Sequence, residues 1–252
     1  MNKISRFKEE TNNTKSNYDY LQQLDNYFKN SVGSNIEKLQ NFPKYVPRQN
    51  LTTFLSKYEI FKKILDVPGS IIECGVSFGG SLMEFAQLSA IFEHVNFERK
   101  IIGFDTFSGF PSLSTIDKKS ISKQAKKGGY SVDSFNDIKK CIELYDSNRF
   151  LNHFSKVEII KGDAVKTIPK YVKNNPSLVV SLLYLDFLLY EPTKIAIENF
   201  IPKMPKGSLL VFNLIGENNW PGPTKALFDT LDTKKLEFKK FTFDPYVHYA
   251  IL

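Results

Sequence analysis

One stretch of the chain, residues 70–81, limits the possible folds most strongly. It starts with a short apolar run that ends in an acid, Glu73, and it leads into a helical pattern of apolar residues over 82–91. Three glycines lie between the acid and this pattern: Gly75, Gly79 and Gly80. The order predicts a buried strand, a glycine turn and the start of a helix, the unit that opens nucleotide-type sites in α/β folds.

The glycine spacing and the acid narrow the choice of ligand. A dinucleotide site needs the order G-x-G-x-x-G so that the backbone can approach a pyrophosphate. Here the order is G-x-x-x-G-G, and a carboxylate two residues before the first glycine would repel a pyrophosphate. The pattern suits a ligand with a cationic aminoacyl end, such as S-adenosylmethionine. The alternative is a tight strand-to-helix connection without a ligand.

Strand and helix patterns alternate along the rest of the chain. Four further apolar segments have the length and composition of buried strands: 100–104, 157–160, 178–185 and 207–212. Two alternating segments, 236–243 and 247–252, predict a hairpin that turns at Asp244 and Pro245. The sequence therefore predicts an α/β fold with a doubly wound, mostly parallel seven-stranded sheet and an antiparallel C-terminal hairpin.

Acids recur at the carboxyl ends of the predicted strands, where ligands bind in such folds. Asp105 ends the second strand, where an acid holds a pair of ribose hydroxyls, or it is a turn or cap acid. Asp163 lies just past the third strand and either contacts an adenine amine or caps the next helix. Asp186 ends the fourth strand. Together with Glu73, these acids predict one site along one edge of the sheet.

The composition, with 42% hydrophobic and 14% aromatic residues, is typical of a globular chain with a full core. The net charge is +7, and a cluster of lysines contributes to it: Lys118, Lys119, Lys123, Lys126 and Lys127. Such a cluster marks a polyanion partner or, more often, a solvated loop. Aromatic residues do not alternate with these lysines as they do in a groove for single strands, so we expect no nucleic-acid partner.

Two segments differ from the alternating pattern. Residues 1–47 carry a broken helical pattern and predict a helical appendage to a main domain at 48–252. This appendage could pack on a neighbouring copy, so a homo-oligomer is one expected form. Residues 112–130 are polar and rich in lysine, and they predict a lid over the site or a disordered loop.

The sequence predicts no membrane anchor and no export signal. The longest apolar stretch, 178–190, contains Asp186 and is too short to span a bilayer. Residues 1–14 are polar and charged. The two cysteines, Cys74 and Cys141, form no metal or disulfide pattern. We therefore expect a cytoplasmic protein without a membrane partner.

Five short stretches together resemble the macrocin O-methyltransferase family of class I, S-adenosylmethionine-dependent sugar O-methyltransferases. These stretches are 70–76, 102–111, 161–164, 185–193 and 220–222. The resemblance implies the Rossmann-like class I methyltransferase fold and S-adenosylmethionine as the methyl donor. It also implies a small-molecule acceptor with a sugar hydroxyl, on a nucleotide sugar, a glycosylated metabolite or a polysaccharide unit.

The resemblance also implies which residues contact the donor. The glycine turn matches the family's first motif, Asp105 matches the acid that holds the ribose, and Asp163 matches the residue near the adenine. The implied donor-binding residues are Glu73, Gly75, Val76, Gly79, Ser81, Asp105, Thr106, Asp163, Ala164 and Asp186.

The acids of the family's metal site are largely replaced. Where relatives carry acids after the fourth and fifth strands and in a Trp-Pro-Gly-Glu turn, this chain has residues without a carboxylate: Leu188, Asn213, Leu214 and Pro223. A hard divalent ion such as Mg²⁺ needs several oxygen ligands, and Asp186 with one amide oxygen supplies few. The sequence therefore assigns no metal ligands.

The missing acids leave the chemistry open, because an alcohol needs a base or a Lewis acid to remove or weaken its proton. In the first interpretation, the enzyme works without metal and Asp186 is the catalytic base. In the second, Glu217 or Glu191 completes a site for Mg²⁺. In the third, the protein binds donor and sugar without turnover. The sequence thus predicts an S-adenosylmethionine-dependent sugar O-methyltransferase, with a non-catalytic binding protein as the alternative.

Overall fold

The structure, a computed structural model, describes residues 13–252, so residues 1–12 of the expected appendage lie outside it. The chain divides into two compact units, Met1–Thr52 and Thr53–Leu252. The division falls within helix α3, Arg48–Lys63, and most of that helix belongs to the larger unit. The expected boundary at residue 47 stays a prediction.

The smaller unit is helical over its described residues. Its elements are α1 Lys15–Asn30, α2 Asn35–Gln40 and the 3-10 turn η3 Phe42–Lys44. A capping box starts α2: the Glu37 amide donates to Ser34 Oγ at 3.3 Å, and the Ser34 amide donates to Glu37 Oε2 at 2.7 Å. Tyr45 packs on α1, with its ring centroid 5.1 Å from that of Phe28. Helix α1 has no buried residue, so local caps and turns shape this unit more than a core does.

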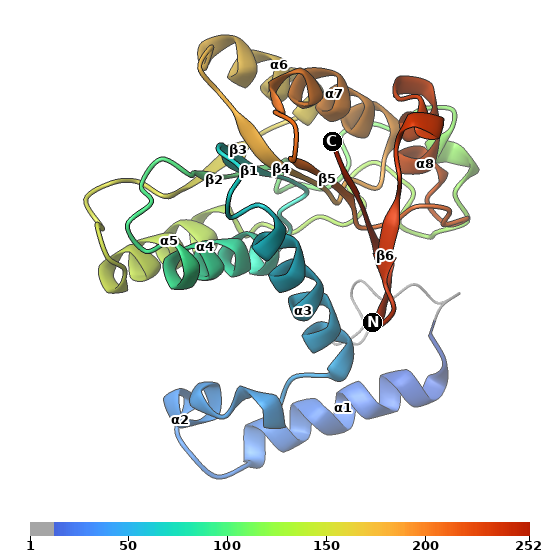
Figure 1. Cartoon of the computed structure of the whole chain (residues 1–252). Coiled ribbons are helices and arrows are strands. Elements are labelled where there is room, and N and C mark those ends of the chain that lie inside the picture. The colour runs from blue at the N-terminus through green and yellow to red at the C-terminus, as the bar shows by residue number, and fades with distance from the viewer. Residues whose placement is uncertain (1–12) are drawn as a thin grey trace. The chain divides into compact units, whose positions relative to one another are not determined.

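The larger unit is built on one seven-stranded sheet in the order β3-β2-β1-β4-β5-β7-β6 (Figure 1). Its strands are β1 Ser70–Cys74, β2 Ile101–Asp105, β3 Val157–Lys161, β4 Val180–Leu185, β5 Leu209–Phe212, β6 Lys239–Phe241 and β7 Asp244–Ile251. The pairs from β3 to β5 are parallel, whereas β7 is antiparallel to β5 and β6. The predicted mostly parallel sheet with an antiparallel C-terminal hairpin is confirmed.

Helices cover both faces of this sheet. They are α4 Gly80–Phe92, α5 Phe135–Asn148, α6 Ala164–Asn174, α7 Tyr190–Phe200 and α8 Pro221–Thr230, with 3-10 turns η4 Asp117–Lys119, η5 Ile201–Lys203 and η6 Thr233–Lys235. Successive strand residues point to opposite faces. Ile71 therefore packs into the core formed with α3, α4 and α5, and Ile72 into the core formed with α6, α7 and α8 (Figure 1).

The hairpin turn differs from the prediction. Strand β6 ends at Phe241 and β7 begins at Asp244, so the chain turns before Asp244 and not at Asp244-Pro245. Asp244 is buried, and its Oδ2 accepts a hydrogen bond of 2.6 Å from the Ser56 hydroxyl on α3. This long-range bond draws the acid into the sheet, which a local turn pattern does not reveal.

Arg99, two residues before β2, joins the segments that enter the sheet. Its side chain is 3% exposed, and its Nε lies 2.8 Å from Oε1 of Glu93 at the end of α4. The guanidinium also donates to Ser181 Oγ on β4 at 2.5 Å. It further donates to three backbone carbonyl oxygens: Ile64, Val67 and Gly69. One buried cation thus fixes the amino ends of β1, β2 and β4.

Arg99→Met is expected to lower the free energy of unfolding by about 3–5 kcal/mol, because it leaves Glu93 buried without its counter-charge. Urea unfolding followed by circular dichroism measures the loss. Lys62→Met is the control, since Lys62 pairs with Glu59 on the exposed surface, and we expect a change within about 0.5 kcal/mol. Equal effects of the two variants would contradict the role of Arg99.

Candidate functional site

The carboxyl ends of β1, β2 and β4 meet at one edge of the sheet. Strand β1 lies between the other two, so the connections leave it in opposite directions and open a crevice for ligands. The register pairs Cys74 with Phe104 and Leu185. Beyond it, the Gly75 amide donates to the Phe104 carbonyl at 2.9 Å, and the Asp186 amide donates to the Cys74 carbonyl at 2.8 Å. This edge is the candidate site.

The turn after β1 fits closely against the end of β4. Gly75 has a φ of +106°, and a Cβ there would lie 2.8 Å from the carbonyl oxygen of Asp186. Asp105 holds the same turn from the end of β2, because its Oδ2 accepts hydrogen bonds from the amides of Val76 and Ser77, both at 2.9 Å. Glycine at position 75 therefore lets the turn touch both neighbouring strands.

Asp105 and Thr106 have local partners in the turn after β2. Asp105 Oδ1 accepts a hydrogen bond of 2.7 Å from the Phe107 amide, and the Thr106 hydroxyl donates to the Gly109 carbonyl at 2.7 Å. A carboxylate has about four acceptor positions, and three backbone amides use only part of that capacity at Asp105. Contacts of Asp105 and Thr106 with a donor stay predictions.

Glu73 lies on the face of β1 that α4 covers. Its side chain is fully buried, and neither carboxylate oxygen has a hydrogen-bond partner. The hydroxyl of Ser81, in the first turn of α4, is also buried without a partner. Burial raises the pKa of Glu73 to about 8, against the opposing effects of the nearby Ser81 hydroxyl and the charge of Lys57. At neutral pH Glu73 is therefore largely protonated, and its contact with a donor stays a prediction.

Asp186 is only partly buried and faces the site directly after β4. Its Oδ1 accepts a hydrogen bond of 2.7 Å from the Asn213 side chain, which follows β5. The Tyr184 hydroxyl donates to Asn213 Oδ1 at 3.4 Å. Burial raises the pKa of Asp186 to about 6, while the Asn213 bond and the charge of Lys57 oppose the rise. Asp186 is thus ionised at neutral pH and is a stronger base than an ordinary aspartate.

The other predicted donor residues lie in or beside the turns of this edge. Gly79 precedes α4 with a φ of +84°, and Val76 and Ala164 are buried. Asp163 caps α6, because its Oδ1 accepts a hydrogen bond of 3.1 Å from the Val165 amide. The cap is one of the two alternatives for Asp163, and its contact with adenine stays a prediction.

Asp117 is a buried acid that the sequence analysis missed. It lies in the 112–130 segment, is 1% exposed, and accepts a hydrogen bond of 2.9 Å from the Tyr190 amide at the start of α7. Its other oxygen accepts hydrogen bonds from the amide and the hydroxyl of Ser114. A Cβ on Gly222, in α8, would collide with Asp117 Oδ1. The Ser-x-x-Asp spacing of 114–117 is a capping signal that could have indicated this acid.

Aromatic rings hold the two ends of the same segment near α8. Phe110 and Tyr130 flank the segment, and their ring centroids lie 5.5 and 5.7 Å from that of Trp220. The Phe110 amide also donates to the Gly129 carbonyl at 3.0 Å, which closes the segment at its base. The 112–130 segment is therefore attached to α7 and α8, next to the end of β4.

The residues around Asp186 do not fit a divalent ion. Within residues 13–252, no group of three or more His, Cys, Asp or Glu residues could hold a metal ion. The Asn213 amide nitrogen binds one Asp186 oxygen, and Leu188 and Leu214 have no side-chain oxygen. Glu217 Oε1 accepts a hydrogen bond from the Asn219 amide within its own turn. We therefore assign no chemistry to a metal ion.

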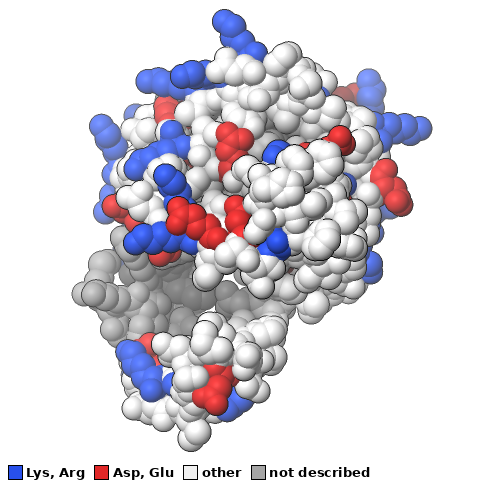
Figure 2. Space-filling model, turned by 90° about the vertical axis from the view of Figure 1, so that its left-hand side faces the viewer, with Lys and Arg blue, Asp and Glu red and all other residues white. Residues whose placement is uncertain are grey.

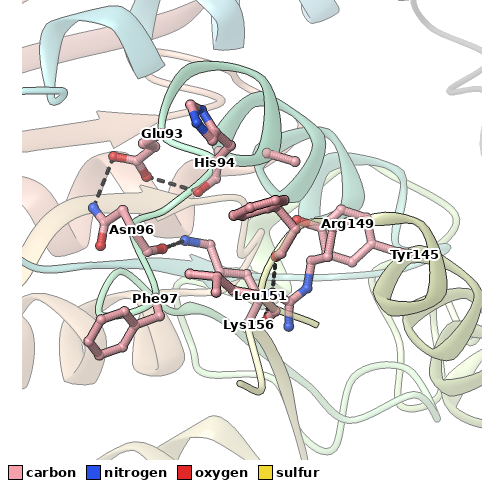
Figure 3. Close-up of a pocket in the computed structure, with 11 residues that line it drawn as sticks. Glu93, His94, Asn96, Phe97, Tyr145, Arg149, Leu151 and Lys156 are labelled. Atoms are coloured by element: carbon pink, nitrogen blue, oxygen red, sulfur yellow. Dashed lines mark hydrogen bonds between the residues drawn. The ribbon is translucent and has the colours of Figure 1, made fainter. Parts of the chain in front are cut away.

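A small pocket far from this edge is not a second site. Figure 3 shows residues that line it, among them Glu93, Asn96, Arg149 and Lys156. Its volume of about 10 Å³ suffices for about one water molecule. Lys156 Nζ donates to the Asn96 carbonyl, and burial lowers the pKa of this lysine to about 8. The pocket lies at the amino ends of the strands and joins the ends of α4 and α5.

Charge is dispersed over the one face of the larger unit that Figure 2 draws. On the face drawn in Figure 2, basic side chains are spread over this unit and acidic ones lie among them. Within the described residues, no helix is long and apolar enough to cross a membrane. The absence of a nucleic-acid partner and the homo-oligomer stay predictions.

The family follows from comparison with known proteins. A profile described as Macrocin-O-methyltransferase (TylF) matches residues 48–226, a range that contains the glycine turn, Asp105 and Asp186. The chain belongs to the macrocin O-methyltransferase family. The resemblance in the sequence analysis is confirmed.

One curated relative is the 8-demethyl-8-(2,3-dimethoxy-alpha-L-rhamnosyl)-tetracenomycin-C 4'-O-methyltransferase of Streptomyces olivaceus. It is 23% identical over 154 residues, which are 58% of this chain and 53% of the relative. The chain thus spans about half the length of this curated relative.

Solved structures agree with this assignment. The calicheamicin methyltransferase CalS11 has a TM-score of 0.90 and 31% identity, over 95% of this chain and 93% of that one. The apo structure of CalS11, described as a TDP-rhamnose 3'-O-methyltransferase, has a TM-score of 0.82 and 30% identity, over 95% of each chain. The O-methyltransferase NovP, at 20% identity over 79% of each chain and a TM-score of 0.63, shows a likeness of fold. The class I methyltransferase fold is confirmed.

Glu73→Gln is expected to change how stability depends on pH. The folded-state pKa of about 8 exceeds the ordinary value of 4.5, so between these pH values the folded protein keeps a proton that the unfolded chain releases. Wild-type stability then falls as pH rises, by at most about 1.4 kcal/mol per pH unit from this group. The stability of Glu73→Gln relative to wild type should therefore rise from pH 5.5 to 7.5 in urea unfolding. Glu198→Gln on the exposed surface is the control, and parallel curves for Glu73→Gln and wild type would contradict the assignment.

Leu188→Asp combined with Asn213→Asp is expected to create measurable affinity for Mg²⁺. The two new carboxylates add ligand oxygens and the negative charge that offsets dehydration of the ion. Calorimetric titration with MgCl₂ measures this, with Leu188→Asp alone as the control. Tight Mg²⁺ binding by the unmodified protein would show that other oxygens complete a site.

Proposed function

We propose that this protein is an S-adenosylmethionine-dependent O-methyltransferase that methylates a hydroxyl group of a sugar. The observation that carries the proposal is the position of Asp186. It is a partly buried residue directly after β4, and its backbone touches the turn after β1. A base thus lies beside a turn that fits the aminoacyl end of a donor.

The residues present fit the donor. Gly75 gives the turn a shape that a Cβ would prevent. Asp105 ends β2, the position from which an acid binds the ribose hydroxyls in a fold of this kind. Glu73 and Ser81 carry buried oxygens without partners behind the same turn. These groups would hold the donor beside the end of β4.

When bound, S-adenosylmethionine supplies a methyl group on a positively charged sulfur, which makes the transfer an in-line displacement that depends on positioning. Asp186 accepts the proton of the acceptor hydroxyl while that oxygen forms its bond to the methyl carbon. Asn213 holds Asp186 through one oxygen, which leaves the other free for this proton. General-base assistance of this kind contributes about 10²- to 10⁴-fold.

The sugar acceptor is supported by the names of relatives. The Streptomyces olivaceus enzyme has a rhamnosyl group in the name of its substrate, and CalS11 is described as a TDP-rhamnose methyltransferase. We propose a sugar of this class, free on a nucleotide or attached to a larger molecule. We also propose that the 112–130 segment covers this acceptor, because Asp117 attaches it to the first turn of α7 beside Asp186.

The second candidate function is a non-catalytic protein that binds donor and sugar. Leu188 and Leu214 favour it, because neither supplies a side-chain oxygen at positions where the resemblance to the family implies acids. Both candidate functions predict that the protein binds the donor. Only the methyltransferase predicts turnover.

The wild-type protein is expected to bind S-adenosylmethionine and to transfer its labelled methyl group to an acceptor from a panel that begins with TDP-rhamnose. Asp186→Asn should lose at least about 10²-fold in kcat at saturating donor, because the acceptor proton has no base. Calorimetric titration measures binding, and mass spectrometry measures the product. Glu198→Gln on the exposed face of α7 is the control.

Failure to bind the donor would overturn both candidate functions. Donor binding without product from any acceptor would favour the non-catalytic protein. Full activity of Asp186→Asn would show that another group takes the proton.

A further inference from the structure

Lys57 is a nearly buried cation that the function described so far does not use. It lies on α3 in the larger unit and is 5% exposed. Its Nζ lies 3.4 Å from Oε2 of Glu84 on α4 and 5.6 Å from the centroid of the Tyr184 ring. A buried ion pair is weak support for stability, because desolvation of the two ions offsets their attraction. A role in stability alone is therefore a poor explanation of this lysine.

Three acids share this one cation. Its charge lowers the pKa of Glu73, Glu84 and Asp186 against the effect of burial. These acids come from β1, α4 and the end of β4, so the charge of Lys57 reaches three elements of the larger unit. Glu84 keeps a pKa raised to about 7, so it can take up a proton if the lysine is lost.

A short path leads from Lys57 to Asp186. Tyr184 is a register neighbour of Glu73 on the face of the sheet that α3 and α4 cover. Burial raises the pKa of Tyr184 well above its ordinary value, so the hydroxyl stays protonated. It donates a hydrogen bond to Asn213 Oδ1. The amide nitrogen of Asn213 is then the atom that faces Asp186 Oδ1.

We propose that Lys57 is a positioning residue for methyl transfer: its enclosed ammonium group, over the face of Tyr184, fixes the Tyr184–Asn213–Asp186 path and keeps the Asp186 carboxylate in the state that accepts the acceptor proton. The inference rests on the proposed function. In the reaction the hydroxyl proton moves to Asp186 and the electron pair of the broken carbon–sulfur bond stays on sulfur. Lys57 exchanges no proton and touches neither substrate.

The rival explanation is a structural ion pair, in which loss of either partner has the same effect. Lys57→Met removes the charge and keeps the length of the side chain. Glu84→Gln breaks the same ion pair but leaves the lysine charge beside Tyr184, so it is the matched control. Lys57→Arg restores a cation, and Tyr184→Phe removes only the hydroxyl that binds Asn213.

Lys57→Met is expected to lower kcat by at least about tenfold; a tenfold change in rate corresponds to the same free energy as a shift of one pKa unit. The KM values for donor and acceptor should stay within about twofold of wild type. Lys57→Arg should recover kcat to within about threefold of wild type, and Glu84→Gln should stay within the same limit. Tyr184→Phe should lower kcat less than Lys57→Met and keep its KM. Steady-state kinetics measures these values, and circular dichroism establishes that each variant folds.

A second measurement needs no turnover. The side-chain amide resonance of Asn213 in a nitrogen–proton spectrum, assigned by its absence in Asn213→Ala, reports the bond to Asp186. It should move in Lys57→Met and Tyr184→Phe and stay in place in Glu84→Gln. If Lys57→Met does not fold, the resonance and kcat of Tyr184→Phe and Lys57→Arg still test the path.

Equal losses of kcat and stability in Lys57→Met and Glu84→Gln would overturn the inference, as would unchanged kcat in Lys57→Met or an amide resonance that does not move. If the wild-type protein binds the donor but forms no methylated product, the proposed function fails. The amide resonance then still decides whether Lys57 positions Asn213 and Asp186.

Discussion

The hydrogen bonds between Asp105 and the turn after β1 are the interaction on which the site depends. The turn contains three residues with positive φ, Gly75 at +106°, Ser77 at +52° and Gly79 at +84°, and Ser77 is strained because it has a side chain. Two amides of this turn have no strand partner and bind Asp105 Oδ2 from the neighbouring strand. These hydrogen bonds therefore hold the turn in the shape that leads into α4. In this shape Gly75 lies against Asp186, and Glu73 is buried behind the turn.

The two faces of the sheet differ in the side chains that β1 and β4 present. Toward α6 and α7, β1 and β4 present apolar side chains throughout: Ile72, Cys74, Leu183 and Leu185. Toward α3 and α4, the same strands present Glu73 and Tyr184 side by side, and Lys57 and Glu84 close over them. Burial of these ionisable groups lowers stability, as the raised pKa of Glu73 indicates. Both faces thus carry an apolar core, and the face toward α3 and α4 also carries charge for the site.

The fold and the edge of the site could be predicted from the sequence, because both follow from local order. Apolar runs separated by helical patterns give the parallel sheet, and acids that end those runs must meet at one edge. The face of the sheet on which Glu73 lies could also be predicted from the sequence. Residues i and i+2 of a strand share a face, so the burial of Ile71 in one core places Glu73 on the same side.

Other features depend on contacts between distant segments, and the sequence carries little sign of them. Asp244 looks like a turn residue, yet its bond to Ser56 crosses 188 positions and draws it into the sheet. Asp117 binds the Tyr190 amide 73 positions away. Such partners are chosen by the packed structure, since several acids in the same chain could satisfy the same amide.

Asn213 stands where the resemblance to the family implies an acid, and this amide determines what holds Asp186. Two ionised carboxylates within hydrogen-bonding distance repel each other, and a bound cation is the usual way to keep them together. An amide removes the repulsion and donates a hydrogen bond of 2.7 Å, so the pair is stable without a bound cation. Besides this hydrogen bond, a positive charge within the protein favours the ionised form of Asp186. Lys57 is the cation whose charge acts on Asp186 in this way, and it does so from behind Tyr184, where it leaves the space in front of the carboxylate to the acceptor.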